Sequence, residues 1–214
     1  MRTSVLLFVS LLFVFSGCSH TKTEYWPNGN EKSKITLHGK SYEGSAKYWY
    51  EDGTIQMECT YHNNLLDGVL TRFYTSGMPC EVQPYANGKL HGTVKTWDIT
   101  GKIIAISNYT NGIITGRYIE YYPNAVTKVE GQYYKGNYDG IWFYYDEGGN
   151  IIGEGRFKNG TGTQKAFYDN GKLKKVTHFQ NNRKDGEEVY YKPEGTVDYI
   201  CRFRGGRLIE KIQK

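Results

Sequence analysis

The sequence predicts an all-β protein, an elongated and twisted antiparallel meander of about eight β-hairpin repeats of 24 residues each. Three observations predict this fold class. Glycines recur every 24 residues, an aromatic residue follows each of them five positions later, and a turn rich in Gly, Asn and Asp separates two short runs within each unit. Stacked units of this kind contact only their neighbours, so the 214 residues are expected to form one elongated body.

The repeat glycines set the register of the whole chain. Taken as position zero, they and the residue that replaces them in the first unit are His20, Gly44, Gly68, Gly92, Gly116, Gly140, Gly162 and Gly186. Position nine is again glycine in every unit except one, where Ala125 stands. Gly162 follows Gly140 after only 22 residues, so the turn at 158–161 is two residues shorter than the others. The eight units fill residues 20 to about 210.

The N-terminal segment 1–17 has the features of a signal peptide. Arg2 precedes an apolar run over 5–15, which is too short for a membrane span and typical of a secretory signal. The run ends in the letters FSGC, which resemble a bacterial lipoprotein signal; that resemblance implies that Cys18 becomes the first mature residue and carries acyl chains. Ser19 resembles the pattern of lipoproteins sent to the outer membrane of a diderm host. We therefore expect a bacterial cell-envelope protein anchored in membrane lipid through Cys18, with an ordinary secretory signal as the alternative.

A polar tether is expected over 18–24, followed by the repeat domain over 25–214. A three-residue loop that ends in glycine, as at 51–53 and 169–171, fits a type I turn closed by a left-handed residue, a conformation that glycine adopts without steric cost. An odd loop length places position five, always aromatic, and position eleven, mostly aliphatic, on one face of the sheet. Position seventeen has the same parity and is aromatic or Leu. One apolar face and one mixed face are therefore expected along the array.

The pattern G-x(4)-[YFW]-[YWDK]-x-x-G-x-[IL]…[YF]-x-x-G closely resembles the bacterial variant of the MORN repeat. This family includes the YwqK-type proteins that are labelled antitoxin components. The resemblance covers residues 25–210 and implies a meander of hairpins in one long antiparallel sheet. It implies scaffold roles and no shared catalytic residues.

Candidate chemical groups favour structural roles. Cys59 and Cys80 differ in strand parity and Cys201 lies five units beyond Cys80, so no disulfide is expected among them. His38 and His62 occupy the same position in successive units, which places them two strands apart, about 9–10 Å, too far to share a zinc ion. No set of residues suggests catalysis. We expect no enzyme activity, no metal and no cofactor.

Acidic residues precede several repeat glycines and are interpreted as turn formers; they are Asp67, Asp139 and Asp185. Charge is unevenly distributed: residues 163–214 hold 12 Lys and Arg against 7 Asp and Glu, and the totals of 27 and 22 leave 15 against 15 for residues 1–162. The basic end is interpreted as the solvated cap of a repeat array, or as a contact for anionic lipid or an acidic partner. An exported protein is not expected to bind nucleic acid.

Position six carries an aromatic column at the start of the array, formed by Trp26, Tyr50 and Tyr74. Tyr and Trp combine apolar area with a polar group, which suits interfaces, so these three residues are the candidate partner-binding residues. The alternative is that the rings only protect the backbone of a thin sheet.

Three functions fit these observations. The first is a membrane-anchored scaffold that binds another protein, of unidentified partner and oligomeric state. The second is an immunity or antitoxin-type protein, which rests on the family label. The third is a cell-wall or carbohydrate-binding module, because choline- and glucan-binding repeats are also aromatic hairpins of similar length.

Overall fold

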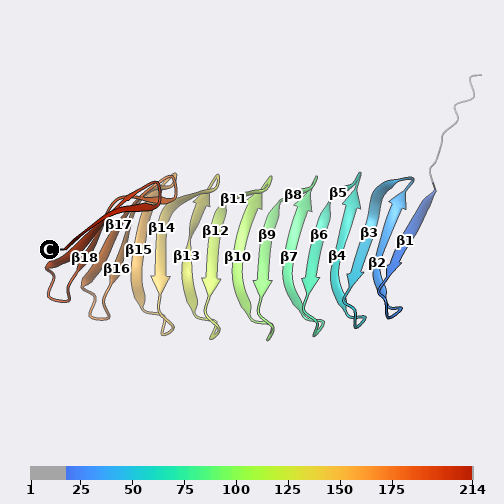
Figure 1. Cartoon of the computed structure of the whole chain (residues 1–214), viewed down its shortest axis with the longest axis horizontal. Helices are drawn as coiled ribbons and strands as arrows, with labels where there is room; N and C mark the ends of the chain where they lie inside the picture. The colour runs from blue at the N-terminus through green and yellow to red at the C-terminus, as the bar shows by residue number, and fades with distance from the viewer. Residues whose placement is uncertain (1–17, 214) are drawn as a thin grey trace, which may run out of the picture.

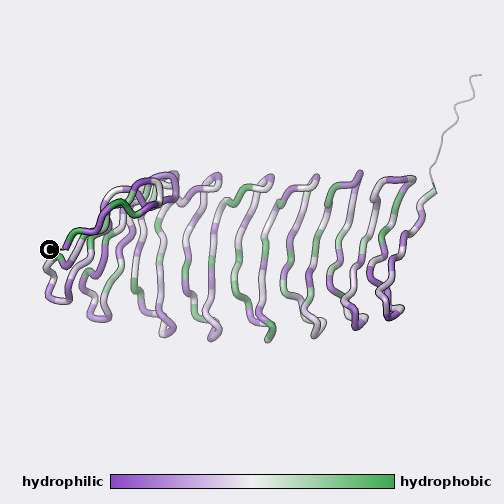
Figure 2. Tube along the Cα trace, in the orientation of Figure 1, coloured by the Kyte–Doolittle hydropathy of each residue, from purple (hydrophilic) through white to green (hydrophobic). Residues whose placement is uncertain are grey.

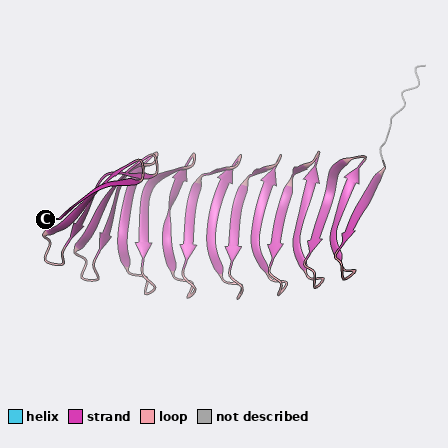
Figure 3. Cartoon of the chain, in the orientation of Figure 1, coloured by secondary structure: helices cyan, strands magenta, loops and turns pink. Residues whose placement is uncertain are grey.

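The computed structural model describes residues 18–213, so the expected signal segment 1–17 lies outside the described residues. The described chain forms a single open antiparallel sheet of 20 strands (Figure 1), and the segments between the strands are turns and short loops (Figure 3). The strands are β1 (Ser19–Tyr25), β2 (Glu31–His38), β3 (Ser41–Trp49), β4 (Ile55–His62), β5 (Leu65–Leu66), β6 (Gly68–Phe73), β7 (Pro79–Ala86), β8 (Lys89–Leu90), β9 (Gly92–Trp97), β10 (Ile103–Thr110), β11 (Ile113–Ile114), β12 (Gly116–Tyr121), β13 (Thr127–Tyr134), β14 (Asn137–Tyr145), β15 (Ile151–Lys158), β16 (Thr161–Phe167), β17 (Leu173–Gln180), β18 (Arg183–Tyr191), β19 (Val197–Arg204) and β20 (Arg207–Gln213).

The predicted meander of hairpin repeats is confirmed. Each strand pairs antiparallel with the next one along the chain, except that β4, β7 and β10 each pair with two successive pieces of one interrupted strand. These pieces are β5 with β6, β8 with β9, and β11 with β12, so the 20 strands lie in 17 rows. The segment 18–24, expected as a tether, contributes most of β1, which pairs along its length with β2.

The turns within the units have the predicted geometry. In the second unit the N–H of Gly53 donates to the carbonyl of Tyr50 at 3.0 Å, and the N–H of Tyr50 donates to the carbonyl of Thr54 at 2.8 Å. Gly53 has φ +89°, the left-handed conformation that closes a type I turn in a three-residue loop. Ala125 adopts the same conformation, with φ +65°, in the one unit that lacks the glycine.

The turns between units are two-residue turns, and in all of them after the first, at 39–40, both central residues have positive φ, as Asn87 and Gly88 do with φ +49° and +75°. This type I′ geometry matches the twist of the strands. These turns are also bonded to one another along the edge of the sheet: the N–H of Gly88 donates to the carbonyl of Leu66 at 2.8 Å, and the N–H of Gly112 donates to that of Leu90 at 2.8 Å. The turn edge of the sheet is therefore a continuous hydrogen-bonded ladder.

A β-bulge occurs at the start of the second strand of every hairpin. Tyr48 pairs with Met57, whereas the next residue, Trp49, pairs with Ile55. Gln56 is the extra residue of the bulged strand. The same register shift occurs in all eight hairpins. A bulge interrupts the alternation of side chains between the two faces.

The bulge overturns one expectation, that positions five and seventeen share an apolar face. Tyr61, at position seventeen, packs against the buried cluster that contains Ala46. Trp49, at position five, lies on the opposite face, where it lines a shallow pocket with Lys34 and Lys47. The prediction was wrong because the extra residue between positions eleven and thirteen was not visible in the spacing of the repeats.

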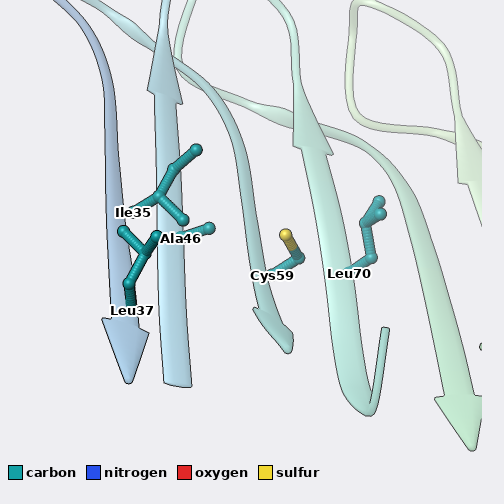
Figure 4. Close-up of a cluster of buried hydrophobic side chains, with 5 residues drawn as sticks. All are labelled: Ile35, Leu37, Ala46, Cys59 and Leu70. Carbon is teal, nitrogen blue, oxygen red and sulfur yellow. The ribbon is translucent and has the colours of Figure 1, made fainter. Parts of the chain in front are cut away.

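One face of the sheet carries a continuous row of largely buried residues, here called the spine. It consists of residues from positions two and fifteen of the units, in register on successive strands, and ends at Lys211, its one exposed member. Its members are Ile35, Ala46, Cys59, Leu70, Gln83, Val94, Ser107, Tyr118, Gly131, Trp142, Gly155, Gln164, Thr177, Glu188, Cys201 and Lys211. The first part is aliphatic, with Ala46 1% and Leu70 3% exposed (Figure 4). The last part is polar. Figure 2 shows apolar and polar segments interleaved along many of the strands.

At the repeat that is two residues short, the neighbouring turns lie close together and are bonded to one another. The N–H of Gly160 donates to the carbonyl of Tyr138 at 2.7 Å, and the N–H of Asn182 donates to that of Gly160 at 2.9 Å. The Asn182 side chain also accepts the N–H of Tyr138 at 2.9 Å, across two hairpins. In Figure 1 the turns around β14 to β18 crowd together accordingly, while the turns of the earlier hairpins are evenly spaced.

Candidate interaction surface

Cys18 lies at the start of the described chain, immediately before β1, and its side chain is exposed. It is a free cysteine at the outermost strand of the sheet. A group attached to this sulfur would therefore hold the array by one end, with the other strands extending away from it (Figure 1).

The three candidate partner-binding residues lie at the edge formed by the type I turns, and each is half-buried. Their polar groups all make the same contact. The indole Nε1–H of Trp26 donates to the carbonyl of Trp49 at 3.1 Å, the Tyr50 hydroxyl to that of Phe73 at 2.8 Å, and the Tyr74 hydroxyl to that of Trp97 at 2.7 Å. Each acceptor lies 23 residues further on, in the next repeat.

The same bond is repeated in later units wherever position six is tyrosine. The Tyr122 hydroxyl donates to the carbonyl of Tyr145 at 2.8 Å, and the Tyr168 hydroxyl to that of Tyr191 at 2.6 Å. Aspartates at this position cap their own turn: Asp98 accepts the N–H of Thr100 at 2.8 Å. Position six is therefore a structural bridge between repeats, and its aromatic rings present their remaining surface at the edge of the sheet.

A shallow pocket of about 380 Å³ lies beside the first two of these rings. Trp26, Tyr48, Trp49, Tyr50 and Gln56 contribute to its lining. The pocket lies at the β-bulge, whose extra residue is Gln56. Aromatic side chains with satisfied polar groups, at a concave edge, form a surface suited to apolar contact with a partner.

The cysteines and histidines are placed apart from one another. Cys59 and Cys201 are buried in the spine, at 4% and 8% exposure, and Cys59, Cys80 and Cys201 are free. His62 Nδ1 lies 2.7 Å from Glu43 Oε1 at a turn. A hydrogen bond from the backbone of Asn63, together with the one from His62, lowers the pKa of Glu43.

Asp139 has a wider role than that of a turn former. Its carboxylate accepts the N–H of Asn159, in the next turn, at 3.0 Å. Asp185 accepts the N–H of Gly205 in the same way at 2.8 Å. Among residues 18–213, three or more His, Cys, Asp or Glu side chains are nowhere gathered as a metal site would require. The same residues include no helix with the length and apolar character needed to cross a bilayer.

A buried polar cluster at the C-terminal end escaped the sequence analysis. The Glu188 side chain is 2% exposed and accepts hydrogen bonds from Lys184 Nζ at 2.7 Å, from the Tyr190 hydroxyl at 2.7 Å and from the Thr177 hydroxyl at 2.8 Å. Lys175 Nζ lies 3.6 Å away. The only sequence signal was an acidic residue at position two, where the second, third and fourth units have Ala46, Leu70 and Val94.

Opposing effects act on the pKa of Glu188. Burial raises it, but the hydrogen bonds from Lys184, Tyr190 and Thr177 and the charge of Lys175 outweigh burial and lower it to about 2. Burial, followed by the hydrogen bond to Glu188, raises the pKa of Tyr190. The carboxylate is therefore charged at neutral pH, and its charge is balanced locally.

Comparison with known proteins identifies the repeat. Four segments match the family model described as MORN repeat variant: residues 42–63, 90–111, 138–159 and 161–181. The chain thus carries MORN repeat variant repeats, in agreement with the resemblance of its repeat pattern to that family. The curated proteins include no match to this sequence. Among solved structures, a chain from the crystal structure of TcdB2-TccC3-Cdc42 is similar over 88% of this chain and 12% of its own length, with 9% identity and a TM-score of 0.23.

Proposed function

We propose that this MORN repeat variant protein is a membrane-anchored scaffold that binds another protein, and that it acts by binding and not by catalysis. Lipid on Cys18 would anchor it in the bacterial cell envelope, in the outer membrane of a diderm host. The observation that carries the proposal is the position of Cys18, exposed and directly before β1. A sheet attached there extends away from the membrane, which suits a protein that presents a long surface.

The proposed partner site is the contact stripe, defined as Trp26, Tyr50 and Tyr74. Its location in the first three units places it close to the proposed anchor. Its support is the geometry of position six: the hydroxyl and indole N–H groups are already bonded to the next repeat, so the rings can take up an apolar contact without leaving a buried polar group unpaired. Aromatic rings anchor many protein interfaces.

The anchor is tested by following the Cys18→Ser variant through membrane fractionation. The parent is expected in the membrane fraction, whereas the variant is released or retains its signal segment. Stable anchoring requires two acyl signals, which a multiply acylated cysteine supplies. If the variant fractionates and migrates like the parent, the lipoprotein proposal fails.

The stripe is tested by recovering bound proteins with the full-length chain in detergent. The double variant Tyr50→Ser with Tyr74→Ser is compared with a matched control, Tyr122→Ser with Tyr168→Ser, which loses the same kind of hydrogen bond in later units. Both should be less stable by about 1–3 kcal/mol, since each lost bond is worth about 0.5–1.5 kcal/mol. The stripe variant alone should lose the partner.

The outcome also separates the alternative functions. Equal loss of partner in both variants would mean that position six acts only through stability. A partner that proves to be a toxin would favour the immunity function, and retention on insoluble cell-wall polysaccharide instead of protein would favour the carbohydrate-binding function.

A further inference from the structure

The spine face of β17 to β20 differs from the rest of the sheet in its chemistry. Two rows of directly paired residues cross these four strands. One row is Lys175, Tyr190, Tyr199 and Gln213, and the other is Thr177, Glu188, Cys201 and Lys211. In the first hairpins the corresponding spine residues are aliphatic and buried. The spine of the C-terminal repeats is thus polar and charged where the spine of the first repeats is apolar.

Each lysine on this face lies over an aromatic ring. The distance from Nζ to the ring centroid is 5.5 Å for Lys175 over Tyr190, 4.9 Å for Lys184 over Phe203 and 4.3 Å for Lys211 over Tyr199. Cation–π contacts of this kind hold an ammonium group close to the surface and reduce its freedom. The rings of Tyr190 and Tyr199 are themselves stacked, with centroids 4.2 Å apart.

The positive charge of the face exceeds its negative charge. The face holds three ammonium groups, those of Lys175, Lys184 and Lys211, and a single carboxylate, that of Glu188, which accepts hydrogen bonds from Lys184, Tyr190 and Thr177. Lys175 is also within 3.6 Å of this carboxylate. Within residues 18–213, Lys211 has no carboxylate at ion-pair distance. One buried charge cannot neutralise three, so the face retains a net positive charge.

We propose that this basic aromatic face, defined as Lys175, Lys184, Tyr190, Tyr199 and Lys211, binds an acidic, extended peptide segment of a partner protein. Lys175 on β17 and Lys211 on β20 are separated by three strand spacings, on the order of 14 Å. Alternate residues of an extended peptide point to the same side about 6.6–7 Å apart, so acidic residues at alternate positions can approach successive lysines while their neighbours cover the stacked rings. The bulk of the basic excess of the chain lies in these same repeats.

The observations favour a peptide over a lipid surface. The Lys175 and Lys184 side chains are only 29% and 36% exposed and are drawn onto rings and onto Glu188, so they do not project toward a flat bilayer. The face also lies at the opposite end of the sheet from Cys18 (Figure 1). This second argument rests on the proposed anchoring, because an anchor at Cys18 keeps the C-terminal repeats far from the membrane.

Fluorescence anisotropy with an eight-residue peptide of alternating Glu and Ala tests the proposal. The full-length chain is kept in neutral detergent micelles, so the measurement does not depend on whether Cys18 carries lipid. The peptide should bind, its Gln-for-Glu counterpart should not, and added salt should weaken binding. Lys211→Gln should weaken binding about fivefold, the value of an exposed charge contact of about 1 kcal/mol.

Lys165→Gln is the matched control. Lys165 lies in the same repeats and pairs with Val176, which alternates with Lys175 and so faces the other side; its own partner is Glu154 at 3.7 Å. The substitution removes the same charge and should leave the affinity within about twofold. Equal weakening by both variants would overturn the proposal in favour of non-specific attraction to the basic end.

Two further measurements test whether the acidic groups that bind this face belong to a peptide, a lipid or a glycan. Micelles doped with phosphatidylglycerol and a polygalacturonate chain are each added as competitors of the peptide. If either binds in a Lys211-dependent manner while the peptide does not, the face recognises lipid or glycan and the peptide proposal fails. If the peptide proposal fails, the results of the Cys18 and stripe experiments still stand, because those experiments test the N-terminal end of the molecule.

Discussion

At the scale of single residues, the turn positions are where sequence and structure agree most closely. Position nine of each unit needs a left-handed backbone because it closes a type I turn in a three-residue loop. Glycine meets this need without a steric penalty, and seven of the eight units have it there, with φ between +77° and +101°. Ala125 adopts φ +65° in the remaining unit. For a residue with a side chain, the left-handed conformation costs about 1–2 kcal/mol.

Ala125→Gly is expected to stabilise the protein by about 0.5–1 kcal/mol. The gain is the relief of the left-handed conformation, reduced by the larger backbone entropy of glycine in the unfolded chain. Thermal or urea unfolding measures it. Ala46→Gly is the control with the same chemical change: Ala46 is 1% exposed within β3, so its variant should lose stability. A loss of stability in Ala125→Gly would show that the turn at 123–125 is not strained.

At the scale of elements, the spine shows how a one-layer sheet buries side chains and backbone without a second layer. Trp142 is 2% exposed although no second layer covers it. Its ring packs against Tyr133, Tyr138 and Tyr118, with centroids 5.0, 4.9 and 5.9 Å away. Its spine neighbour on β13 is Gly131, which has no side chain. The ring therefore lies flat over the adjacent strand and buries its backbone.

Gly131→Ala is expected to destabilise the protein by about 1–3 kcal/mol, the usual cost of overpacking. A Cβ atom at Gly131 would lie 2.1 Å from Trp142 Cδ2, and the surrounding tyrosines leave the ring little room to move. Gly148→Ala is the control, since its Cβ would meet only the flexible Asn150 and Asp146 side chains at 3.2 and 3.3 Å. Chemical denaturation of both variants provides the comparison. Equal stability of the two would mean that the ring is not confined as described.

At the scale of the whole molecule, each repeat is bonded mainly to its neighbours, and the Asn182 side chain adds a contact with Tyr138 two units away. Hydrogen bonds join each strand to the next, and both edges are reinforced: one by backbone bonds between type I′ turns, the other by side chains at position six. In such an array local stability can differ from one end to the other. The aliphatic spine at the N-terminal end has no titratable group comparable to Glu188 at the C-terminal end.

Acid should therefore loosen the C-terminal repeats first. The pKa of Glu188 is held near 2 in the folded protein, below its ordinary value of 4.5, so its contribution to stability is full above about pH 4.5 and is lost as the pH falls toward 2. Hydrogen exchange, corrected for the intrinsic effect of pH, should show protection of β17 to β20 falling between pH 5 and about pH 3 before that of β2 to β4.

Glu188→Gln provides the internal control for this effect. It should lower the stability of the C-terminal repeats at neutral pH, because Lys184 and Lys175 lose their buried partner. It should also remove most of the difference between pH 5 and pH 3. Loss of protection that spreads evenly over all repeats in the parent protein would contradict the assignment to Glu188.

The sequence by itself determined the repeat, the hairpins and the chemistry of the turns. These features are local: a glycine, an asparagine or an aspartate fixes the backbone of the few residues around it, and eight copies of one pattern leave a single topology. Ala125 was visible from the sequence as the exception to a rule. The resemblance to the MORN repeat variant rested on the same local pattern and is confirmed in four segments.

Only the tertiary structure decided which side chains meet. The bulge at Gln56 and its equivalents moves position five to the face opposite position seventeen, and strand alternation read from spacing cannot detect an extra residue. The hydrogen bond from Tyr50 to Phe73 joins neighbouring hairpins, and the contacts of Glu188 with Thr177 and Lys175 join neighbouring strands, in a register that the bulges set. Contacts of that kind depend on register and on the packing of side chains in three dimensions, which a one-dimensional pattern does not contain.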